Sequence, residues 1–145
     1  MRSTYRVIAY ALAVEVVVQM MTIAYGLAGL GKWIDDKHVL TKQVWDSSKP
    51  HFTGIGGLAL HTINGVMLIP LLTIALLFVS FFAKVPGGTR RAATLVGLVV
   101  LQIVLGFALH AVPFVALLHV LNAVGILVMA FLAGSRVPKD EAITT

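Results

Sequence analysis

The sequence predicts an all-α integral membrane protein, built as a four-helix bundle within a single domain, residues 1–145. Composition is the first reason. Hydrophobic residues make up 59% of the chain and charged residues only 12%, and the mean hydropathy is +0.95. A soluble domain is nearer half apolar and a quarter charged. The second reason is that four apolar runs reach the ~18–20 residues needed to cross the hydrocarbon of a bilayer.

The four predicted spans cover about residues 5–31, 53–83, 92–109 and 113–134, and an outer loop covers residues 32–52. The first run is too long for a signal-peptide core, so we expect it to be retained as a span. Cytoplasmic loops are enriched in Lys and Arg. Seven basic residues lie in the two tails and in the loop 84–91, against four in the outer loop, where three Asp offset them. We therefore expect both termini on the cytoplasmic side of the membrane.

The net charge of +5 follows from these loop residues, so it needs no nucleic-acid partner to explain it. Membrane lipids are the expected surroundings instead. The chain has no cysteine, which excludes disulfides, thiolate metal sites and covalent haem attachment through thiols.

The first span carries a stripe of polar and small residues that lies within an arc of about 80° on a helix. Its members are Glu15, Gln19, Thr22, Gly26 and Gly29. Such a stripe faces the protein interior, because lipid cannot satisfy its polar groups. Glu15 lies near mid-membrane, where it is either a proton-handling or quinone-contacting group or a protonated side chain that helps the helices to pack.

The outer loop contains two tryptophans suited to the membrane interface, Trp33 and Trp45, and residues 39–45 are expected to form a short amphipathic surface helix. The second span then presents a face of small and polar residues within an arc of about 100°. That face consists of Gly54, Gly57, His61, Asn64 and Gly65. Its glycines would admit a flat group or another backbone. Pro70 is expected to kink the rest of this span.

The third span places Gln102 and Gly106 on one face, and the fourth contains His119 and Asn122. The segments that begin at His61 and His119 both read His-x-x-Asn-small-Val. Val-Val-Val-Gln in the first span also matches Val-Val-Leu-Gln in the third. We therefore expect two parallel helical hairpins, related by a pseudo-twofold axis along the membrane normal.

Depth in the bilayer links the two histidines. His61 lies roughly 13 Å along its helix from the outer end, and His119 roughly 9 Å. Imidazoles at similar depth on facing helices suit the two axial positions of one porphyrin, so the predicted cofactor is a b-type haem. Zinc would need three or four ligands close together. The alternative is two buried histidines that bond to carbonyls or to the two asparagines.

In the haem interpretation, glycines shape the slot and amides supply polar contacts around it. The glycines are Gly54, Gly57, Gly65 and Gly106, and the amides are Asn64, Asn122 and Gln102. His38 lies in the outer loop and is not expected to be a ligand. His110 sits at the water boundary, where an interfacial role is favoured, although a second ligand set with His51 stays open.

The chain has a histidine on the second and on the fourth span, and its third span reads Leu-Gln-Ile-Val-Leu-Gly at residues 101–106. In these features it resembles one four-helix half of the heme A synthase family. The chain also looks like small bacterial four-helix membrane proteins with the same histidine plan. The resemblance covers about residues 5–134 and implies a haem held between His61 and His119. Leu58 and Thr62 stand where the family's catalytic half has Glu and Arg, and a second four-helix half is missing. The resemblance thus implies haem binding without the family's hydroxylation chemistry.

These observations together predict a bis-histidine haem protein that transfers electrons or handles haem, either alone, as a subunit of a larger membrane complex or beside a redox partner. A haem-free accessory or scaffold subunit is the alternative from another class. A small quinone-linked oxidoreductase, resting on Glu15 and the haem jointly, is the third.

Overall fold

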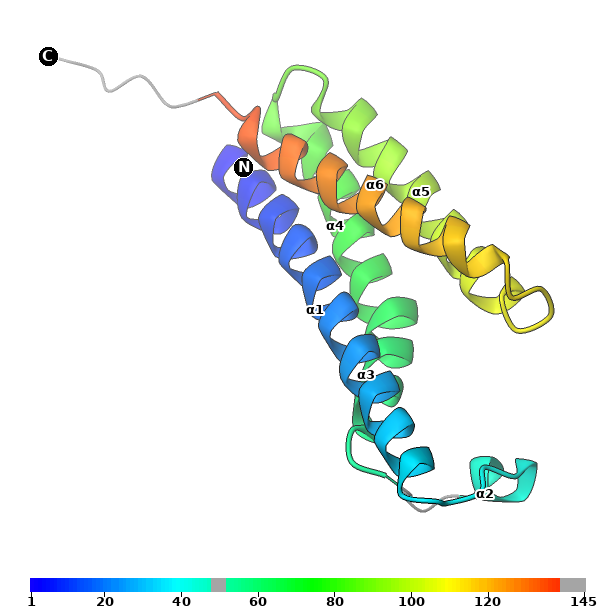
Figure 1. Ribbon diagram of the computed structural model, residues 1–145. Coiled ribbons are helices and arrows are strands. Elements are labelled where there is room, and N and C mark those ends of the chain that lie inside the picture. The colour runs from blue at the N-terminus through cyan, green and yellow to red at the C-terminus, as the bar shows by residue number, and fades with distance from the viewer. Residues whose placement is uncertain (48–51, 139–145) are drawn as a thin grey trace, which may run out of the picture.

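A computed structural model describes residues 1–47 and 52–138, and every regular element in these ranges is a helix (Figure 1). The helices are α1 (Arg2–Asp35), α2 (Lys42–Asp46), α3 (Ile55–Ile63), the π-helical turn η1 (Asn64–Leu68), α4 (Ile69–Ala83), α5 (Gly88–Ala108) and α6 (Val115–Ser135). His51 and the basic residues Lys49 and Lys139, which entered the sequence-based expectations, lie outside the described residues.

Four helical stretches are long and apolar enough to cross a membrane, and they match the four spans expected from the sequence. They are Arg2–Asp35, Ile55–Ala83, Gly88–Ala108 and Val115–Ser135. The first is longer than predicted at its end, where Lys32 forms an i,i+4 ion pair with Asp36. The predicted surface helix is present but begins later, at Lys42, because the Thr41 hydroxyl accepts a hydrogen bond from the backbone N–H of Val44.

The main cluster of buried apolar residues lies toward one end of the bundle, which we call the inner end and which holds the start of α1 and the end of α6 (Figure 1). Here α1 packs against α4 and α6, and α5 packs against both of those helices. The largest fully buried side chains are Tyr5, Leu12, Thr73, Leu76, Leu95 and Ile126. The Tyr5 hydroxyl donates a hydrogen bond to the Gly88 carbonyl (3.0 Å), which joins the start of α1 to the start of α5.

At the opposite end, which we call the outer end, the two helical hairpins diverge. The hairpin of α5 and α6 leans away from the hairpin of α1, α3, η1 and α4 (Figure 1). There α3 packs closely against α1 and at most weakly against α5 or α6. The turn between α5 and α6 is flanked by large exposed apolar side chains, among them Phe107, Phe114 and Leu117. Apolar side chains in this position are suited to lipid or to a membrane partner.

The sequence predicts a kink at Pro70, and the structure has a π-helical turn directly before this residue. The backbone N–H of Ile69 bonds to the carbonyl of Asn64, five residues back. Proline has no N–H and its ring clashes with the carbonyl four residues earlier, so a wider turn relieves the conflict. The π turn also shifts the side-chain register by one residue, which sets how His61 and Asn64 face relative to α4.

Candidate functional site

His61 from α3 and His119 from α6 face each other at the level where the two hairpins begin to diverge. Their ring centroids are 6.4 Å apart and the ring planes are inclined by 56°. Both side chains are half-buried. Since α3 and α6 make no extensive contact of their own, this pair is where the two hairpins come together above the core.

The His61 imidazole is oriented by the first helix. Its Nδ1 lies 3.1 Å from the backbone carbonyl oxygen of Gln19. A carbonyl can only accept a hydrogen bond, so Nδ1 carries the proton and the neutral ring has its free lone pair on Nε2. This is the arrangement by which proteins fix the tautomer of a metal-ligating histidine.

The His119 imidazole packs against the third long helix. A Cβ at Gly106 would lie 3.2 Å from the His119 Cε1 atom, closer than ordinary contacts, so glycine lets the ring lie against the α5 backbone. The Nδ1 atom of His119 is buried and has no hydrogen-bond partner.

The two asparagines hold equivalent places beside the histidines. Asn64 Nδ2 donates to a carboxylate oxygen of Glu15 at 2.7 Å. Asn122 Nδ2 donates to Gln102 Oε1 at 2.7 Å and to the Leu98 carbonyl at 2.9 Å. Each asparagine thus ties its own hairpin together one turn from a histidine. The hairpins differ in that one anchoring group is a carboxylate and the other an amide.

Buried polar atoms without a hydrogen-bond partner gather around this pair. They are Gln19 Nε2 and Oε1, Asn64 Oδ1 and His119 Nδ1. Buried polar groups in proteins are nearly always paired, and leaving one unpaired costs about 1–3 kcal/mol. These atoms lie beside the two facing imidazoles, where a polar ligand or water would pair with them.

The two imidazoles lie at a centroid distance of 6.4 Å, within the roughly 4.5–7 Å at which aromatic rings pack in direct contact. His61 and His119 would be the residues to hold a metal ion between the two hairpins. Among the described residues no group of three or more His, Cys, Asp or Glu side chains could enclose a metal ion by itself. With two imidazole donors, such an ion would need further ligands from outside this set, as a porphyrin would supply.

The structure brings together most of the residues selected from the sequence: His61, His119, Asn64, Asn122, Gln102 and Gly106. Gly65 lies beside the Gln19 side chain, where an added Cβ would make only ordinary contacts of 3.8–3.9 Å. Gly54 adopts a left-handed backbone conformation (φ 97°) at the start of α3, which explains why a glycine occupies this position.

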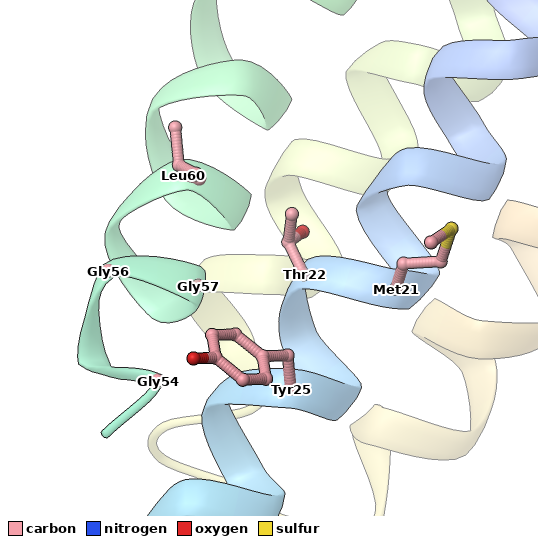
Figure 2. Close-up of a pocket in the computed structure, with 7 residues that line it drawn as sticks. All are labelled: Met21, Thr22, Tyr25, Gly54, Gly56, Gly57 and Leu60. Carbon is pink, nitrogen blue, oxygen red and sulfur yellow. The ribbon is translucent and has the colours of Figure 1, made fainter. Parts of the chain in front are cut away.

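Gly57 packs against another backbone, which is one of the two roles that the sequence allowed for the glycines of this face. A Cβ at this position would overlap the Thr22 carbonyl and approach the Gly26 nitrogen, so Gly57 is the point where α3 touches the backbone of α1. It also lines an open, mainly apolar groove of about 590 Å³ with Tyr25 and Leu60 (Figure 2). Its smallness is explained by close packing of two helices.

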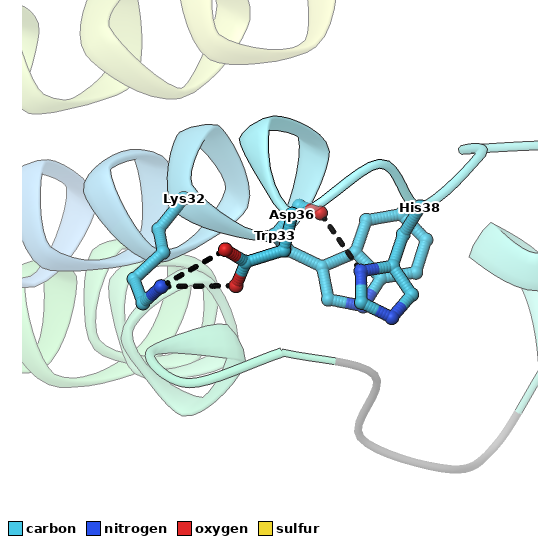
Figure 3. Close-up of polar contacts among 4 residues, drawn as sticks. All are labelled: Lys32, Trp33, Asp36 and His38. Atoms are coloured by element: carbon cyan, nitrogen blue, oxygen red, sulfur yellow. Dashed lines mark hydrogen bonds and ion pairs between the residues drawn. The ribbon is translucent and has the colours of Figure 1, made fainter.

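The remaining described histidines belong to the outer loops. His38 stacks on Trp33 with ring centroids 4.8 Å apart, and its Nδ1 donates to the Trp33 carbonyl at 3.0 Å (Figure 3). The neighbouring ion pair joins Lys32, in the last turn of α1, to Asp36, which follows the last residue of that helix (Figure 3). His110 is exposed at the end of α5, with Nδ1 3.3 Å from the Phe107 carbonyl.

Two groups were not assigned to the site from the sequence, namely the Gln19 carbonyl and the Glu15 carboxylate. The signal for Gln19 was present, because the repeat Val-Val-Val-Gln and Val-Val-Leu-Gln makes it the counterpart of Gln102. In comparisons with protein-family models, curated proteins and solved structures, nothing matches this chain. A functional assignment therefore rests on the site itself.

Proposed function

We propose that this protein is a multi-pass membrane protein that binds one b-type haem through Nε2 of His61 and of His119, and that it transfers single electrons or handles haem. The observation that carries the proposal is the facing imidazole pair, 6.4 Å apart, with Nε2 of His61 left free by the bond from Nδ1 to Gln19. The unpaired polar atoms around the pair support it further.

The chain's own residues account for the properties such a site needs. The Gln19 carbonyl holds the His61 ring in one tautomer and one orientation. Gly106 leaves room for the His119 ring against α5. The bonds of Asn64 to Glu15 and of Asn122 to Gln102 fix the helices that carry the two ligands. When bound, haem iron with two histidine ligands supplies one-electron redox chemistry.

The proposed placement in the membrane follows from charge. The inner end carries the basic residues Arg2, Arg6, Lys84, Arg90, Arg91 and Arg136. Cytoplasmic surfaces of membrane proteins are enriched in such residues. We infer that both termini are cytoplasmic in a bacterial inner membrane. The two helical hairpins are then parallel repeats. One consists of α1, α3, η1 and α4, and the other of α5 and α6. Each carries its histidine on the segment that runs from the outer to the inner end, His61 on α3 and His119 on α6.

A haem-free accessory or scaffold subunit is the second candidate, and one observation favours it. The outer parts of α5 and α6 expose Phe107, Leu117 and Leu121 at 67%, 63% and 68%, so a neighbouring membrane protein could cover them. The same surface is compatible with a haem protein that works within a larger complex or beside a redox partner. The quinone-linked alternative rests on the half-buried Glu15.

Histidine substitution tests the proposal. Protein from haem-replete cells is purified, and the haem-to-protein ratio is measured as the pyridine haemochrome. His61→Ala and His119→Ala should each lower haem affinity at least roughly tenfold, since each removes an axial ligand. His38→Ala is the matched control, because the described contacts of His38 are with Trp33 at the outer end of α1 and not with the facing histidines.

Equal loss in all three variants would point to misfolding, and unchanged haem content in the first two would refute ligation by this pair. A colourless wild-type protein would favour the scaffold function instead.

A further inference from the structure

The inner end of the bundle contains a small cavity between the start of α5 and the end of α6. Its volume is about 190 Å³, and it is lined by Arg90, Arg91, Thr94, Met129, Leu132 and Arg136. The cavity is thus lined by three arginines, one threonine and two apolar residues, which come from the start of α5 and the end of α6. It lies at the opposite side of the core from the two histidines and plays no part in the proposed haem site.

The guanidinium groups are not neutralised by carboxylates within the described chain. The ion pairs found there join Lys32 to Asp36 and Lys42 to Asp46, both in the outer loop region. Arg91 donates through one terminal nitrogen to the Pro86 carbonyl at 2.7 Å, but its Nε is buried without a partner. A concentration of positive charge with an unpaired buried donor attracts an anion.

The lining changes from charged to apolar along the membrane normal. Arg90 lies in the first turn of α5 and Arg136 is the residue that caps α6, so both lie at the inner rim. Leu132 and Met129 lie one and two turns deeper on α6. Thr94 lies one turn deeper on α5, where its hydroxyl donates to the Arg90 carbonyl at 3.0 Å. An anionic head at the rim and an acyl chain along Leu132 and Met129 would match this gradient.

We propose that this cavity binds the phosphate of an anionic phospholipid, with its acyl chain running along α6. Arginine is suited to phosphate because its planar fork donates two parallel hydrogen bonds, and basic pockets between membrane helices are a known setting for lipid headgroups. The small volume admits a phosphate group and not a large soluble ligand. Free phosphate would use the same arginines but not the apolar wall.

Lipid binding to the purified full chain can be measured by native mass spectrometry. The protein is mixed with equal amounts of phosphatidylglycerol and phosphatidylethanolamine that carry the same acyl chains. We expect one phosphatidylglycerol to be retained in preference, and Arg90→Gln and Arg136→Gln each to weaken its binding roughly tenfold, as loss of a charge-assisted contact implies. Lys84→Gln is the matched control, because Lys84 is an exposed cation of the same end that does not line the cavity.

Equal weakening by all three substitutions, or equal retention of both lipids, would overturn the proposal, because binding would then reflect general surface charge. A second measurement separates the two sources of phosphate. Phosphatidylglycerol should raise the thermal stability of the wild type and not of Arg136→Gln, while inorganic phosphate should neither raise it nor displace the lipid. Displacement by inorganic phosphate would show that the cavity takes a soluble anion, which would refute the lipid assignment.

Discussion

Gly106 gives the most specific test of how the site is built. A Cβ added there would lie 3.2 Å from His119 Cε1 and 3.6 Å from Nδ1. In Gly106→Ala the ring must therefore shift by only a few tenths of an ångström, and alanine favours the helix by roughly 0.5–1 kcal/mol, so stability should hardly change. In Gly106→Leu the branched side chain occupies the space of the imidazole itself, and overpacking of this kind costs about 1–3 kcal/mol.

The expected result is therefore graded. Gly106→Ala should retain most of its haem, and Gly106→Leu should lose it, at least roughly tenfold in affinity, because the ring can no longer reach the ligating position. Gly97→Leu is the matched control on the same helix, since a Cβ at Gly97 meets nothing within 4 Å. The assay compares the haem-to-protein ratio with the yield of monodisperse protein in detergent.

Full haem occupancy in Gly106→Leu would refute the reasoning, because it would show that His119 does not need its observed position. Equal loss of haem in Gly97→Leu would also contradict it, since that residue faces open space.

Two further predictions concern the helices around the site. Gly57→Leu should lower the yield of monodisperse protein, because its side chain would push α3 away from the α1 backbone at Thr22. Gly56→Leu is the control and should leave the yield unchanged, because a Cβ at Gly56 meets nothing within 4 Å. Equal yields from the two variants would show that α1 and α3 do not pack as described. Asn122→Leu removes two hydrogen bonds and should cost about 1–3 kcal/mol of stability, measurable as a lower thermal unfolding midpoint; an unchanged midpoint would mean that these bonds contribute nothing.

The spans could be predicted from the sequence because an apolar run of sufficient length has few alternatives to a membrane helix. The proximity of His61 and His119 could be anticipated too, since helix rise converts residue number directly into depth. The inward face of Gln19 followed from its place on a polar stripe. These inferences depend on local periodicity, which sequence expresses well.

What the sequence could not reveal depends on contacts between helices. Gly57 and Gly65 share an arc with His61, yet one packs on the α1 backbone and the other lies beside a glutamine side chain. The π turn before Pro70 changes the register of that face, and sequence alone predicts only some disturbance there. The divergence of the hairpins also escaped prediction, because the exposed outer parts of α5 and α6 are as apolar as a buried helix would be.

The most direct test of the central proposal is the absorption spectrum of the purified wild-type protein, oxidised and then reduced with dithionite. Two histidine ligands at one haem predict a Soret band and, on reduction, sharp α and β bands typical of a six-coordinate b-type haem, with one haem per chain in the pyridine haemochrome. A protein that carries no haem after expression in haem-replete cells and after addition of haem in vitro, or one whose reduced spectrum is five-coordinate, would contradict bis-histidine ligation by His61 and His119.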